Sequence, residues 1–95
     1  MEQSPHEIAE DVVKMAGHFA RGSELYAKYI KKRADFFHQE RQNYKSDNAT
    51  EKAFDRTEDG VIMTELKMKL KSLTTQISAK KAYLKVLSDE AHNQM

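Results

Sequence analysis

The C-terminal part of the chain carries a heptad pattern of apolar residues. From Met63 to Ala91, side chains suited to a core recur alternately every three and every four residues. This spacing is typical of a helix that packs against other helices along a seam, and it predicts a helix over about residues 61–92. We expect this seam to form an oligomer interface through Met63, Leu66, Leu70, Leu73, Ile77, Leu84 and Leu87. Lys80 interrupts the seam and is expected to extend out to solvent rather than to set the oligomer register.

The N-terminal half of the chain shows a second helical stripe. Ser4, Pro5 and Glu7 match the start of a helix, with serine as the capping residue. Apolar or aromatic side chains then keep one helical phase as far as Phe36, which predicts a helix over about residues 5–45. The members of this apolar stripe, which are expected to face the core, are Ile8, Val12, Met15, Phe19, Tyr26, Tyr29 and Phe36.

Gly22 occupies one position of this stripe. Because the helical phase continues after it, we expect a kink or a close helix contact near residue 22. A full break, with Ser23 capping a new helix, is the alternative.

The region between the two stripes is polar and rich in turn-forming residues. We expect the connection at about residues 45–50, where Asn48 could cap a following helix. Ala53 and Phe54 then indicate a short helix or turn over about residues 50–60, with an interruption at residues 58–60.

These elements predict an all-α fold in a single domain of residues 1–95. The expected architecture is a long helical hairpin, made of two long helices plus a short helix or turn. Two antiparallel helices leave each seam half covered, so the hairpin is expected to assemble into an oligomeric helical bundle.

Composition excludes several classes of protein. The chain has no cysteine, its four histidines are scattered, and its three glycines are isolated, so no metal site, phosphate loop or catalytic group is expected. We therefore expect a protein that is not an enzyme and that needs no cofactor. No segment approaches the ~20 apolar residues of a membrane span, and no signal peptide is visible, so the expected location is the cytoplasm, or the host cytoplasm if the protein is viral, without a membrane partner.

Charge is distributed unevenly, although the formal net charge is only +1. Residues 1–24 carry five acidic residues against two basic ones, and residues 46–60 repeat that excess. Residues 28–45 carry six basic residues against two acidic ones, and residues 67–85 hold six lysines and no acidic residue. Such blocks indicate a polyanionic partner.

The segment 31–37, KKRADFF, places three cations close to two phenylalanines. Phe36 continues the apolar stripe, whereas Phe37 lies one position off it and could stack on a base or simply widen the core. Arg33 could contact a ring or reach a phosphate. A cationic track beside a stacking ring is how nonspecific proteins hold single strands.

A second basic stripe runs beside the C-terminal seam, with lysines at both ends and hydroxyl groups in the middle: Lys67, Lys71, Thr74, Ser78, Lys81 and Lys85. Every member can donate a hydrogen bond to a phosphate oxygen, although lysines beside a seam also have a purely structural explanation. The residues expected to bind nucleic acid are Lys28, Lys31, Lys32, Arg33, Phe37, Lys67, Lys71, Lys81 and Lys85.

The segment 31–37 resembles the basic–aromatic motif of the UvsY family of phage recombination mediators. Two further segments are similar to segments of that family: LYAKYIKK at 25–32, and FDRTEDG at 54–60, which is followed by a lysine-rich helix. The resemblance covers about residues 25–85, with phenylalanines where the family has tyrosines and with a longer loop. It implies an oligomeric helical protein that binds single-stranded DNA and helps to load a recombinase onto strands covered by a single-strand-binding protein. On that basis Lys31 and Arg33 match the cationic positions that contact DNA.

The sequence therefore predicts a non-catalytic accessory protein of phage type that binds single-stranded DNA without sequence preference and forms a homo-oligomer. The alternative is a helical-hairpin module for protein interaction, such as an adaptor, a chaperone or an inhibitor, whose apolar seam receives the partner.

Overall fold

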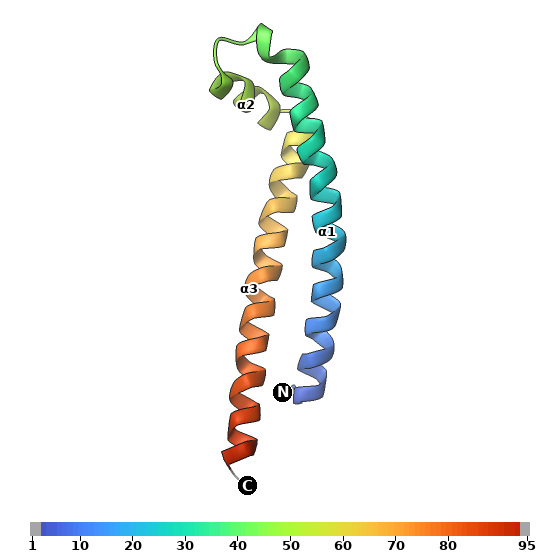
Figure 1. Ribbon diagram of the computed structural model, residues 1–95, viewed down its shortest axis with the longest axis vertical. Helices are drawn as coiled ribbons and strands as arrows, with labels where there is room; N and C mark the ends of the chain where they lie inside the picture. Colours follow the sequence, from blue (N-terminus) through green and yellow to red (C-terminus); the bar gives the residue numbers. More distant parts are fainter. Residues whose placement is uncertain (1–2, 94–95) are drawn as a thin grey trace. The chain divides into compact units, whose positions relative to one another are not determined.

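The computed structural model describes residues 3–93, and the burial of side chains as far as Glu90. This part of the chain contains helices and no strand, so the prediction of an all-α chain is confirmed. The elements are α1 (Pro5–Glu40), the short 3-10 helix η1 (Arg41–Asn43), α2 (Asp47–Asp55) and α3 (Glu58–Asn93) (Figure 1).

The start of α1 follows the prediction from the sequence. The backbone amide of Glu7 donates a hydrogen bond to the Ser4 hydroxyl oxygen at 3.2 Å, as expected of a capping serine. The helix then continues through Gly22, so a full break with a new cap at Ser23 is wrong. It ends at Glu40, five residues before the predicted position near 45, because η1 tightens the chain into the connection.

The start of α2 differs from the prediction. Ser46, and not Asn48, is the capping residue, since its hydroxyl oxygen accepts a hydrogen bond from the amide of Ala49 at 3.1 Å. The connection accordingly lies earlier in the chain than the predicted residues 45–50, and α2 ends at Asp55.

Residues 58–60 do not interrupt the chain as the sequence analysis expected; they form the first turn of α3. Thr57 caps this helix, because its side-chain oxygen accepts a hydrogen bond from the amide of Gly60 at 3.1 Å. Gly60 is buried and lies against the end of α2. A Cβ atom at this position would lie 2.7 Å from the Cα of Asp55 and closer still to the carbonyl oxygen of Phe54.

The chain divides into two compact units. The terminal unit combines Met1–Arg21 with Lys71–Met95, and the central unit is Gly22–Leu70. Each unit therefore contains one segment of α1 and one segment of α3, and the central unit also contains η1 and α2.

In the central unit, α2 packs onto α1 through aromatic contact. Phe54 is only 2% exposed, and its ring centroid lies 5.4 Å from that of Phe36. Thr50 is completely buried, and its hydroxyl group donates a hydrogen bond to the carbonyl oxygen of Ser46 at 2.9 Å, so the burial leaves this polar group satisfied. Between α1 and α3, Gly22 allows close approach, since a Cβ there would lie 2.8 Å from a methyl carbon of Leu70.

In the terminal unit, Ile8 is the most deeply buried apolar residue described, at 2% exposure. The predicted seam of α3 is present in both units as a line of half-buried side chains. None of its members is fully buried: Met63, Leu66, Leu70, Leu73, Ile77, Leu84 and Leu87. The heptad pattern therefore identifies the inner side of α3 correctly, and one copy of the chain covers that side only in part.

Candidate nucleic-acid interface

The two cations at the centre of the basic segment 31–37 are engaged within the central unit. The ammonium group of Lys32 lies 3.5 Å from a carboxylate oxygen of Asp59 and 4.9 Å from the ring centroid of Tyr29. Arg33 donates a hydrogen bond to the carboxylate of Glu51 at 2.7 Å. Neither Lys32 nor Arg33 therefore carries an uncompensated positive charge.

These two ion pairs are open to solvent. The side chains of Arg33 and Glu51 are 36% and 49% exposed, and those of Lys32 and Asp59 are 53% and 44% exposed. Exposed pairs of this kind contribute only ~0–1 kcal/mol to stability. A phosphate oxygen could consequently replace the carboxylate at small cost.

The ring of Phe37 is also in contact with a charged side chain. The guanidinium group of Arg33 lies 4.7 Å from the centroid of its ring, which is the cation–π contact that the sequence allowed for Arg33. One face of Phe37 is thus covered by a cation, and Phe37 itself is half-buried. This placement reduces the ring surface that a base could reach.

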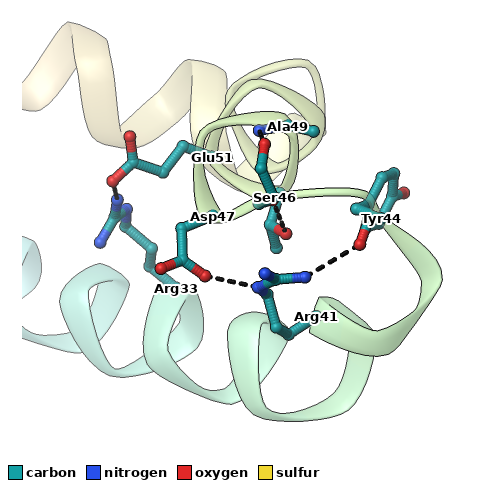
Figure 2. A network of polar contacts seen from close by, with 8 residues as sticks. Arg33, Arg41, Tyr44, Ser46, Asp47, Ala49 and Glu51 are labelled. Carbon is teal, nitrogen blue, oxygen red and sulfur yellow. Dashed lines mark hydrogen bonds and ion pairs between the residues drawn. The ribbon is translucent and has the colours of Figure 1, made fainter.

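A network of polar contacts fixes the connection between α1 and α2 beside this segment (Figure 2). Arg41 pairs with the carboxylate of Asp47 and also donates a hydrogen bond to the backbone carbonyl oxygen of Tyr44 at 2.9 Å. Ser46 caps α2 in the same region. The network helps to hold Glu51 where it meets Arg33, because it ties the start of α2 to η1, which directly follows α1.

The remaining predicted cations are exposed. Among the residues that the structure describes, no carboxylate forms an ion pair with Lys28, Lys31, Lys67, Lys71, Lys81 or Lys85. These six lysines are therefore the predicted binding residues whose positive charges remain available to a polyanion.

One cleft of the central unit brings both basic blocks together. It has a volume of about 420 Å³ and is bounded by α1, the end of α2 and the start of α3. Arg33 contributes from the first block and Lys67 from the second, and the lining also includes the apolar side chains of Ile30 and Met63. Tyr26 lines the same cleft, although the sequence analysis did not include it among the binding residues.

A smaller cleft lies in the terminal unit. It has a volume of about 260 Å³ and is lined by Phe19 of α1 together with Thr74, Ser78 and Lys81 of α3. These three α3 residues belong to the predicted stripe of lysines and hydroxyl groups. The stripe thus borders an aromatic side chain here as well.

Lys80 corrects one prediction. Its ammonium group donates hydrogen bonds to the Asp11 carboxylate at 3.2 Å and to the Gln3 side-chain oxygen at 3.1 Å, and the lysine side chain is 27% exposed. Lys80 is therefore a link across the terminal unit and not a side chain extended into solvent. Hydrogen bonds from Gln3 and Lys80 hold the pKa of Asp11 below its ordinary value of 3.8.

The carboxylate partners of the basic segment were missed in the sequence, although a signal for them was present. Glu51 and Asp59 both belong to the acidic block 46–60, which follows the basic block 28–45 directly. Once the chain reverses direction between the two blocks, opposite charges face each other. Alternating blocks of charge can therefore indicate contacts within the chain as well as an external partner.

Two further kinds of site are absent from the described residues. No group of three or more histidine, aspartate or glutamate side chains there could hold a metal ion. No helix in the same part of the chain has the length and apolar character that a membrane span requires.

Comparisons with protein-family models, with curated protein sequences and with solved structures found no match for this chain.

Proposed function

We propose that this protein binds single-stranded DNA without sequence preference, as a non-catalytic accessory protein whose copies associate through the half-covered seam of α3. The observation that carries the proposal is the central cleft, because Arg33 and Lys67 lie 34 positions apart in the sequence yet line the same cavity. The resemblance of segment 31–37 to phage recombination mediators supports a role in loading a recombinase. Nonspecific binding to single strands requires a cationic track with aromatic groups beside it, and this cleft combines both.

The carboxylates at this surface give the proposal a specific test. If Arg33 exchanges Glu51 for a phosphate, then Glu51→Gln removes a competitor and should raise the affinity for an oligonucleotide about 2–5-fold, equivalent to the ~0.5–1 kcal/mol of an exposed ion pair. Lys67→Gln should lower the affinity and reduce the slope of log affinity against log salt concentration by about 0.7. Fluorescence anisotropy across a salt series measures both effects.

Lys52→Gln is the matched control, because Lys52 is an exposed lysine of α2 outside the proposed surface. It should leave the slope within error of the wild type. Absence of oligonucleotide binding at low salt would overturn the proposed function. Equal effects of Lys52→Gln and Lys67→Gln on the slope would show that the central cleft is not the surface that binds the strand.

One observation favours a second candidate, a module for protein interaction. Val61 and Met68 lie seven residues apart on one face of α3 and are 48% and 68% exposed. A partner helix could cover such a face. A purified protein that is free of nucleic acid, judged by its ratio of absorbance at 260 and 280 nm before any high-salt wash, would favour this candidate.

A further inference from the structure

We propose that the central cleft is a subsite for one base of the bound strand, stacked on the ring of Tyr26. This inference rests on the proposed function and adds to it the residue that meets the base. Tyr26 belongs to the apolar stripe that was expected to face the core. The stacking residue is therefore Tyr26 and not Phe37, which the sequence had suggested.

The rings of Tyr26, Tyr29 and Phe37 differ in what already covers them. Arg33 lies over Phe37, and Lys32 lies over Tyr29. Tyr26, by contrast, has no cation or second ring stacked on it among the residues that the structure describes, and it borders a cavity. Of these three rings, Tyr26 is thus the one that lines this cleft.

The lining of the cleft matches the chemistry of a nucleotide. A base has flat apolar faces, and these are served by Tyr26, Ile30 and Met63. Its polar edge carries donors and acceptors, and the exposed carboxylate of Asp55 can accept a hydrogen bond from an exocyclic amino group. The volume of about 420 Å³ lies within the ~300–1,000 Å³ typical of sites for small organic groups.

The cations of the cleft are suited to the phosphates that flank such a base. Lys67 has no carboxylate partner in the described chain, so its charge is available. Arg33 donates to Glu51 through one terminal nitrogen, and the guanidinium group has further N–H donors. Arg33 and Lys67 therefore hold the backbone of the strand while Tyr26, Ile30 and Met63 hold the base.

The test compares two oligonucleotides of about 20 nucleotides, longer than the ~4–16 nucleotides that one compact single-strand site covers. One is oligodeoxycytidylate, and the other has the same phosphates with abasic tetrahydrofuran sugars. Because stacking of one base contributes at least ~1 kcal/mol, wild-type protein should bind the first at least about 5-fold more tightly at equal salt. Tyr26→Leu should abolish most of this difference while the salt slope persists.

Tyr29→Leu is the matched control, since Tyr29 occupies the same apolar stripe of α1 but does not line the cleft. It should keep the preference for the strand that carries bases. Tyr26→Phe should keep it too, because the ring remains. A second measurement on the unaltered protein is photo-crosslinking with a strand containing 5-iodouracil, in which the crosslinked peptide should contain Tyr26.

The outcomes separate this inference from the function on which it rests. Salt-dependent binding without any preference for bases, or a crosslink at Phe37 and none at Tyr26, overturns the base subsite and leaves the proposed function intact. Absence of binding to both strands overturns the function and the subsite together. Binding of a fluorescent polyglutamate peptide in place of either strand would assign the cleft to an acidic protein partner and overturn both.

Discussion

Individual residues decide the geometry of this chain at a few close contacts. Gly60 is the clearest example, because the backbone at the end of α2 occupies the space that any side chain would need. Gly17 shows the opposite situation: a Cβ there would meet only the flexible end of Arg21, at 3.6 Å. The same substitution should therefore have opposite effects at the two positions.

Gly17→Ala should raise the free energy of unfolding by about 1 kcal/mol, because alanine is the better residue inside a helix. Gly60→Ala should lower it by about 2–3 kcal/mol, because the backbone of α2 must shift to admit the methyl group. Urea unfolding followed by circular dichroism measures both values. Stabilisation by Gly60→Ala would show that the junction of α2 and α3 is looser than described.

The ion pairs at the site could not be predicted from individual residues of the sequence. The positions of Arg33 and Lys32 were evident as a cluster, whereas their partners Glu51 and Asp59 depend on where α2 and α3 return to α1. Tyr26 was assigned to the apolar stripe for a similar reason, since spacing places it on a face but does not show that a cavity borders it.

At the scale of the helices, short polar side chains determine where α2 and α3 begin. Ser46 and Thr57 each accept a hydrogen bond from the amide three residues later. Loss of such a cap leaves a helical N–H group without its partner. The two caps stand on either side of α2 and so determine its placement against Phe36.

Ser46→Ala and Thr57→Ala should each lower the free energy of unfolding by about 1 kcal/mol, within the ~0.5–2 kcal/mol observed for capping residues. Ser88→Ala is the control, because Ser88 is exposed inside α3 and alanine favours the helical interior. Melting temperatures that do not separate the two cap variants from Ser88→Ala would contradict these assignments.

The long helices could be predicted from the sequence because their apolar spacing is repeated over many turns. The ends of the helices could not, since a cap depends on one side chain among several suitable ones. Asn48 and Ser46 are both good capping residues, and Gly60 suggests a loop unless one knows that Thr57 caps the helix containing it. The Ser4 cap was evident because Pro5 follows it and fits only the first turn.

At the scale of the whole molecule, the limited core of one chain is the main feature. The seam of α3 is half-buried along its length, and large apolar side chains such as Val86, Met68 and Ile30 are about half exposed or more. A chain of 95 residues has little apolar surface to bury by itself. Association with further copies would increase the buried surface of each.

Light scattering should accordingly give a mass above the 11.0 kDa of one chain, and the melting temperature should rise with protein concentration. Leu84→Asn places an amide in the seam and should lower both the mass and this concentration dependence. Ser88→Asn, one turn further along α3 and outside the seam, should change neither. A mass of 11.0 kDa at every concentration would exclude association.

The pairing of Arg33 with Glu51 also affects how an affinity measurement must be interpreted. When a free lysine neutralises a phosphate, the strand releases a condensed cation into solution. When Arg33 moves from Glu51 to a phosphate, the abandoned carboxylate attracts a cation in return, and the net release is smaller. For wild-type protein, the number of phosphates contacted would thus exceed the number calculated from the dependence of its affinity on electrolyte concentration. The Glu51→Gln protein lacks this carboxylate, so the same calculation would give the larger, true number.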